Sequence, residues 1–145
     1  MRYWDSSAMV PLLAREEYST TSATLLSEDH AIVTWWGSRL ECLSALRRRE
    51  REDGLETATL AISLRLLDDL SAGWHELLPG EELRFAAERA LAVHPLRAPD
   101  ALQLAAALTW RGPSVRAAEF VCLDERLREA AEREGFSALP VTLST

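Results

Sequence analysis

Four acidic residues border the apolar segments of the chain and could act together on one charged ligand. Asp5 follows the apolar segment at the N-terminus, and Asp124 follows the apolar run 120–123. Asp100 stands in the first turn of a predicted helix, and Glu41 lies among apolar neighbours. Several carboxylates at one place repel one another, and a hard divalent cation with oxygen ligands relieves that repulsion. Together the four residues indicate a metal site.

Each acid taken alone also has a structural explanation. Asp5 can accept hydrogen bonds in a turn with the two serines that follow it. Asp100 and Asp124 can stabilise helix N-termini. Glu41 is harder to explain in this way, because burying a carboxylate among apolar residues is costly unless its charge is compensated. The metal-site hypothesis therefore depends on the combination of the four acids.

Strands and helices that alternate along the chain would position these acids. Strands are predicted over residues 2–5, 31–35, 74–78, 120–123 and 139–143. Helices are predicted over residues 7–16, 21–27, 37–52, 55–70, 81–93, 99–110 and 125–134. In the first helix Ser7 is the predicted N-cap and Pro11 is placed near the first turn.

This alternation predicts one α/β domain over residues 1–145, with a parallel sheet and helices on both of its faces. In such sheets ligands bind beyond the carboxyl ends of the strands. Asp5, at the end of the first predicted strand, and Asp124, directly after the fourth, are expected at that edge.

The composition excludes several other functions. The 145 residues are 48% hydrophobic, which is enough for a core, and they include no lysine. A P-loop nucleotide site needs its lysine, and receiver domains and haloacid-dehalogenase-like phosphatases use one as well. No apolar run approaches the roughly 20 residues that span a bilayer, and no secretory signal is found. We therefore expect a cytoplasmic protein that does not bind membranes.

The cysteines and histidines do not suggest a second kind of site. Cys42 and Cys122 are isolated in the sequence and are expected to be reduced and buried. The three histidines match no zinc spacing and are expected on the surface or in loops.

The charge pattern leaves two interpretations open. The net charge of −7 argues against tight RNA binding without metal, although bound cations would offset part of it. The arginines of segment 47–51 are either a solvated helix end or an edge that contacts phosphates. Arg97 either pairs with an acid or reaches substrate.

Trp35 and Trp36 cannot both face the core of a strand, so one of them is expected to be exposed, where it can stack on a base or meet a partner.

Four segments resemble the acidic motifs of PIN-domain nucleases, most closely those of VapC-type toxins from bacterial toxin–antitoxin pairs. They are residues 3–7, 40–46, 96–105 and 120–127, in the order of the family motifs. Cys122 stands where the family usually has threonine or serine, and Pro99 is uncommon before the third acid. The tandem tryptophans Trp35 and Trp36 are bulky where the family often has polar residues. None of these departures removes an acid.

The resemblance implies a PIN-like three-layer α/β/α fold with a central parallel sheet of about five strands. It also implies Mg²⁺ or Mn²⁺ held by Asp5, Glu41, Asp100 and Asp124, and hydrolysis of RNA phosphodiester bonds by this endoribonuclease site. The substrate-binding candidates are Ser7 and Arg97.

Family members usually form homodimers and are held inactive by an antitoxin, so we expect both partners. The apolar segment 55–70 offers surface for dimerisation. Two alternatives stay open. One is a catalytically silent PIN module that binds nucleic acid or protein, and the other is a metal-dependent phosphoesterase that acts on another substrate, such as DNA.

Overall fold

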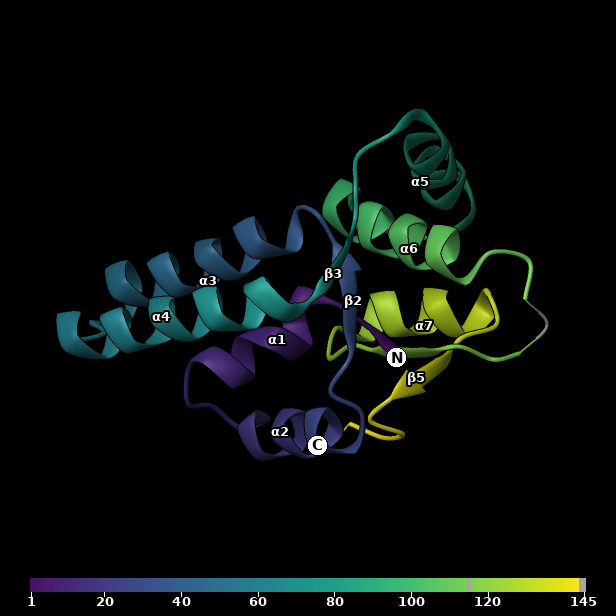
Figure 1. Cartoon of the computed structure of the whole chain (residues 1–145). Helices are drawn as coiled ribbons and strands as arrows, with labels where there is room; N and C mark the ends of the chain where they lie inside the picture. The colour runs from purple at the N-terminus through teal and green to yellow at the C-terminus, as the bar shows by residue number, and fades with distance from the viewer. Residues whose placement is uncertain (115, 144–145) are drawn as a thin grey trace.

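Five short parallel strands form the centre of the protein (Figure 1), whose computed structural model describes residues 1–114 and 116–143. In this part of the chain the strands are β1 (Arg2–Trp4), β2 (Ile32–Trp35), β3 (His75–Leu77), β4 (Glu119–Val121) and β5 (Ser137–Leu139). Their order in the sheet is β3-β2-β1-β4-β5, and every neighbouring pair is parallel. The order places β1 beside β4, so the residues that follow these two strands emerge at the same edge.

Seven helices flank the sheet within the described residues. They are α1 (Ser6–Leu13), α2 (Ser19–Glu28), α3 (Ser38–Glu52), α4 (Thr57–Gly73), α5 (Glu81–Val93), α6 (Ala98–Arg111) and α7 (Glu125–Arg133). Figure 1 shows α3 and α4 running side by side away from the sheet, with α5 and α6 on the other side of it. None of the helices in the described part of the chain has the length and apolar character needed to cross a bilayer.

Two hydrophobic cores lie on opposite faces of the sheet, because successive strand side chains alternate between the faces. Tyr3 packs in one core with α5, α6 and α7, whereas the next residue, Trp4, packs in the other with α1, α2, α3 and α4. Phe120 and Val121 of β4 divide in the same way. The predicted α/β class, with its central parallel sheet between two helical layers, is therefore confirmed.

Most predicted elements occur within a few residues of their expected bounds, but the last strand was predicted too late. The sequence favoured residues 139–143, because valine and threonine follow Pro140. The structure instead ends β5 at Leu139. Pro140 has no backbone N–H to donate to a neighbouring strand, and its ring restricts the backbone, so the strand ends before it.

The start of α1 also differs from its prediction. Asp5, not Ser7, is the N-cap, and its side chain accepts a hydrogen bond from the Ser7 backbone N–H. The helix begins at Ser6 and ends at Leu13, which places Pro11 inside the helix and beyond its first turn.

The expectation that the histidines lie on the surface or in loops holds for His94, which is in a loop but is buried. His94, directly after α5, is 6% exposed. Its Nε2 atom lies 3.7 Å from the Glu134 carboxylate. Other expectations are confirmed: both cysteines are buried, and Trp35 is buried whereas Trp36 is 54% exposed.

Candidate active site

One pocket of about 310 Å³ is lined by all four of the acids selected from the sequence, Asp5, Glu41, Asp100 and Asp124. Asp5 and Asp124 follow the carboxyl ends of the adjacent strands β1 and β4, Glu41 lies near the start of α3, and Asp100 lies in the first turn of α6. The other lining residues are Ser6, Ser7, Val10, Ser44, Ala45 and Arg48. Four elements that are distant in sequence therefore contribute carboxylates to one hollow at the carboxyl edge of the sheet.

Asp5 is the most deeply buried of the four, with 3% of its surface exposed. Its Oδ2 atom accepts a hydrogen bond from the Ser7 N–H at 3.1 Å and lies 3.6 Å from the Cys122 thiol, which donates to it. Burial raises the pKa of Asp5 above its ordinary value, and the charge of Asp124 adds to the rise, while the hydrogen bonds oppose it. The site thus holds Asp5 in a surrounding that disfavours its charge.

Glu41 receives one hydrogen bond on each carboxylate oxygen. The Ser6 hydroxyl donates to Oε1 at 2.8 Å, and the Gln103 amide donates to Oε2 at 3.1 Å. Burial and the nearby charge of Asp5 raise the pKa of Glu41 to about 7 despite these two bonds. Glu41 therefore changes its protonation state close to neutral pH.

Asp100 and Asp124 occupy the first turn of α6 and the N-cap of α7, respectively. The Leu127 N–H donates to Oδ1 of Asp124 at 2.9 Å, so one oxygen of this carboxylate caps the helix. Burial and the charges of Asp124 and Asp5 raise the pKa of Asp100 to about 6, against the opposing effect of Arg97 and Arg126. The shifted pKa values at three acids reflect carboxylates that are desolvated and interact with one another.

Of the two predicted substrate-binding residues, Ser7 lines the pocket and Arg97 does not. Ser7 lines the pocket, and its hydroxyl accepts a hydrogen bond from the Leu123 N–H at 2.9 Å, which ties α1 to the segment after β4. Arg97 is the N-cap residue of α6 and is exposed. Its charge acts on Asp100, but it is not among the lining residues of the pocket.

Sequence reasoning did not single out Ser6 or Gln103, which hold the Glu41 carboxylate. Gln103 is completely buried in α6, three residues after Asp100. One signal was available, because Gln103 is the polar residue of the otherwise apolar segment 102–108. Such a residue must find hydrogen-bond partners inside the protein.

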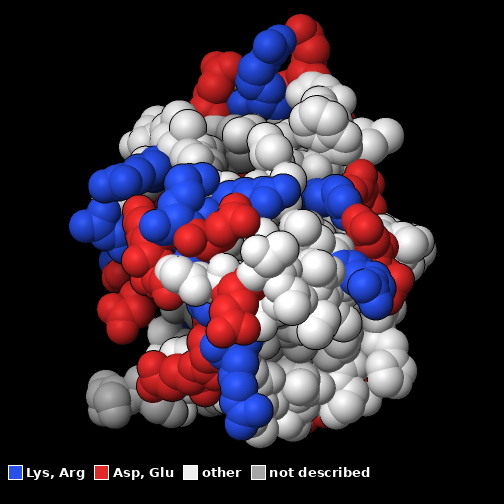
Figure 2. Space-filling view, turned by 90° about the vertical axis from the view of Figure 1, so that its left-hand side faces the viewer, with Lys and Arg blue, Asp and Glu red and all other residues white. Residues whose placement is uncertain are grey.

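The arginines at the end of α3 were expected to be either a solvated helix end or an edge that contacts phosphates, and the structure places them in different surroundings. Arg47 bonds to Glu50, and Arg49 pairs with Glu16. Arg48 instead lines the acidic pocket, seven residues and two turns after Glu41 on the same helix. Figure 2 views the side of the molecule that carries the free ends of α3 and α4, where arginine side chains gather across the middle with acidic side chains between them.

The chemistry of the donor set fits a hard divalent cation, because the pocket offers carboxylate and hydroxyl oxygens and an excess of negative charge. The geometry is not that of a closed coordination shell. Across residues 1–114 and 116–143 no group of three or more His, Cys, Asp or Glu side chains is placed to hold a metal ion. Because protein donors occupy oxygens of Asp5, Glu41 and Asp124, side chains must reorient before three carboxylates can share one ion.

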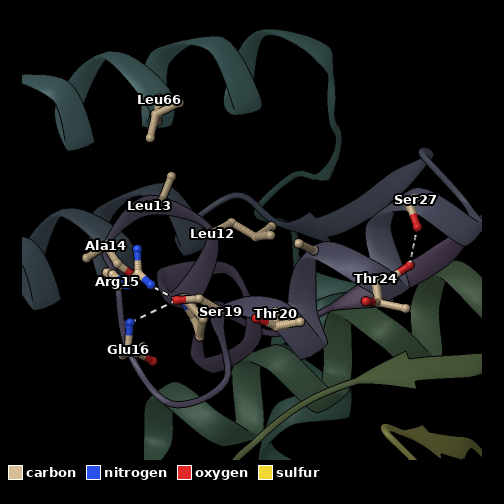
Figure 3. A pocket seen from close by; sticks show the side chains of 12 residues that line it. Leu12, Leu13, Ala14, Arg15, Glu16, Ser19, Thr20, Thr24, Ser27 and Leu66 are labelled. Carbon is tan, nitrogen blue, oxygen red and sulfur yellow. Dashed lines mark hydrogen bonds between the residues drawn. The ribbon is translucent and has the colours of Figure 1, made fainter.

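A larger hollow of about 660 Å³ lies between α1, α2 and α4, and it differs in character from the acidic pocket. Figure 3 shows Leu13 and Leu66 pointing toward each other across it, with Ser19 and Thr20 along the α2 side. Its single carboxylate, Glu16, pairs with Arg49. Volume alone therefore does not locate the chemistry, which we assign to the smaller pocket with four carboxylates.

No protein-family model matches the chain, and no curated protein matches its sequence. The functional argument for this site therefore depends on the residues themselves.

The raised pKa values predict how pH affects the stability of the metal-free protein. Between the ordinary pKa values of carboxylates, about 4, and the folded-state value of Glu41, about 7, the folded protein binds protons that the unfolded chain does not. The contribution of these protons to the free energy of unfolding should therefore be fully present at the lower end of this window. It should be lost as the pH rises through about 7. Thermal unfolding in EDTA across this range measures the effect.

A matched pair of variants assigns that pH dependence to the pocket. Glu41→Gln should remove a large part of it, because the amide does not titrate. Glu17→Gln, at an exposed position outside the pocket, should leave it unchanged. Equal pH dependence in Glu41→Gln and the wild type would contradict the assignment.

Proposed function

We propose that this protein is a metal-dependent endoribonuclease of the PIN-domain type, and that it acts as the toxin of a VapBC-type toxin–antitoxin pair. One observation carries the proposal: four carboxylates, each from a different element, line one pocket at the carboxyl edge of a five-stranded parallel sheet. The same four acids occur in the motifs that resemble the PIN family.

The residues present would suit Mg²⁺ or Mn²⁺, with Asp5, Asp100 and Asp124 as direct ligands and Glu41 as a ligand or as the residue that orients water. The chemistry supplied by such an ion, when bound, is polarisation of a phosphodiester oxygen and activation of water for attack. Glu41 lines the pocket with its carboxylate held by Ser6 and Gln103, and is therefore placed to accept a proton from a water molecule there.

Basic and hydroxyl side chains around the pocket suit a phosphate backbone. Arg48 lines the pocket and can donate charge-assisted hydrogen bonds to a phosphate oxygen. Arg97 lies near Asp100 at the start of α6 and can contact the RNA backbone outside the pocket. Ser7 accepts the Leu123 N–H and donates to Cys122 Sγ at 3.7 Å, a weak acceptor that a carboxylate or phosphate oxygen can replace.

Cleavage of matched RNA and DNA strands tests the substrate class. We expect the purified protein with Mg²⁺ to cut the RNA strand and to leave the DNA strand of the same sequence intact. An Asp124→Asn preparation purified in parallel controls for contaminating nucleases. Cleavage of both strands would favour a broader phosphoesterase, and binding of RNA without cleavage would favour the silent module. Either result would reject the ribonuclease proposal.

The proposed partners are a second copy of the chain and an antitoxin, acting in the cytoplasm. Exposed apolar side chains on α4 support a protein partner, because Ile62 is 56% and Leu66 is 42% exposed. Leu66 also borders the hollow between α1, α2 and α4 shown in Figure 3. The net charge of −7 agrees with a protein that depends on bound cations to approach RNA.

A further inference from the structure

A buried chain of hydrogen bonds connects Glu41 to the interior of the sheet. The Tyr3 hydroxyl donates to Oε1 of Gln103 at 2.7 Å. The Gln103 Nε2 atom donates to the Ser38 hydroxyl oxygen at 2.9 Å and to Oε2 of Glu41 at 3.1 Å. Both Tyr3 and Gln103 are 0% exposed, so these groups have no access to bulk solvent as an alternative partner.

When Glu41 is ionised, the donors and acceptors of this hydrogen-bond network favour one orientation of the Gln103 amide. The Tyr3 phenol is protonated at neutral pH, and its hydroxyl donates to Oε1 of Gln103 at 2.7 Å. The amide oxygen accepts this hydrogen bond, and the amide nitrogen then faces Ser38 and Glu41. In the opposite orientation the amide oxygen would lie against the ionised Glu41 carboxylate, and the bond from the amide nitrogen to Oε2 would be lost.

The series of hydrogen bonds continues to the backbone that precedes Asp5. The Thr34 hydroxyl donates to the Trp4 carbonyl oxygen at 2.7 Å, and Thr34 Oγ1 lies 2.6 Å from Ser38 Oγ. Because Thr34 has used its one hydroxyl hydrogen, Ser38 must donate to Thr34 and accept from Gln103. Gln103 itself lies one turn after Asp100 on α6. These hydrogen bonds therefore connect Glu41 with the backbone before Asp5 and with the helix that carries Asp100.

We propose that Gln103 is a positioning residue that fixes the orientation of the Glu41 carboxylate toward the pocket, and that Tyr3 fixes the orientation of the Gln103 amide. This inference rests on the proposed nuclease function. Partners that orient metal-binding or reacting groups affect activity through geometry rather than through contact with substrate. A purely structural role would lower stability alone and would leave the activity of the folded protein unchanged.

Substitution of Gln103 by methionine tests this role, because methionine keeps a similar shape and cannot donate to Glu41. We expect kcat for RNA cleavage to fall by about 10- to 100-fold in Gln103→Met, with little change in KM. We also expect the Mg²⁺ concentration that gives half of the maximal rise in Tm to be higher in this variant. This readout does not depend on cleavage. Leu104→Met, at the next buried position of α6, is the matched control for packing and should keep wild-type kcat.

A milder variant keeps the test decisive if Gln103→Met does not fold. Tyr3→Phe removes only the hydroxyl that orients the amide, so kcat should fall in the same direction and by a smaller factor. Wild-type kcat and Mg²⁺ dependence in folded Gln103→Met, or in Tyr3→Phe when Gln103→Met does not fold, would overturn the positioning role while the nuclease function stands. A wild-type protein that neither cuts RNA nor is stabilised by Mg²⁺ would reject the proposed function, and the positioning role with it.

Discussion

Asp5→Asn should lower RNA cleavage by about two to three orders of magnitude and leave the protein folded. The substitution removes a negative charge from the pocket, where electrostatic groups aimed at the reacting centre typically contribute effects of this size. It nearly preserves the shape of the side chain. The expected loss is therefore one of chemistry, to be measured as kcat/KM on a short labelled RNA with Mg²⁺ present.

The same substitution should keep or raise the stability of the metal-free protein. Asp5 is 97% buried and its pKa is raised mainly by burial, so ionising it in the folded state costs free energy. Its other role is to cap α1 through the Ser7 N–H. Asparagine caps helices about as well as aspartate does, because it also offers a side-chain oxygen.

Asp5→Ala separates the two roles of this residue. Alanine removes both the charge and the cap, and loss of a cap costs about 1 kcal/mol. Thermal melts without metal should therefore place Asp5→Asn at or above the wild type, and Asp5→Ala below Asp5→Asn. A destabilised Asp5→Asn that cleaves RNA at the wild-type rate would show that Asp5 is only a structural cap.

The positions of the acids could be predicted because they depend on a coarse property of the sequence. Alternating strands and helices imply a parallel sheet, and Asp5 and Asp124 each follow a strand. Any error of one or two residues in the bounds leaves both acids at the same edge. The adjacency of β1 and β4, which brings the two acids together, became evident only from the strand order.

The misplaced features depend on contacts that sequence patterns do not contain. Asp5 and Ser7 are both good caps, and only the backbone path shows that Asp5 caps α1. Residues 141–143 have a composition typical of strands, yet the sheet ends before Pro140. His94 lies in a loop as expected, but its burial involves residues distant in sequence, such as Glu134, whose carboxylate lies 3.7 Å from His94 Nε2.

The support of Glu41 was likewise hidden from the sequence. The pattern identified a glutamate among apolar neighbours, which is costly to bury without partners. Its partners, Ser6 and Gln103, come from α1 and α6, and nothing in the local sequence pairs them with α3. A search for polar residues inside apolar helices would have selected Gln103 as a candidate, but not its partner.

Removal and return of the metal tests the central claim, that the four-carboxylate pocket works through a bound divalent cation. In the metal-free protein the acids of this pocket lack a compensating cation, and the pKa values of Asp5, Glu41 and Asp100 are raised. A cation that binds the folded protein in preference to the unfolded chain stabilises the folded state in proportion to the logarithm of its concentration. Activity and stability should therefore respond together to the same ion.

The most direct measurement follows RNA cleavage and Tm on one preparation that is treated with EDTA and then titrated with Mg²⁺ or Mn²⁺. The account predicts that EDTA abolishes cleavage, that either ion restores it, and that Tm rises over the same concentration range. Asp5→Asn should show a smaller rise in Tm and little recovery of cleavage. RNA cleavage by the wild type that continues undiminished in EDTA would contradict the account.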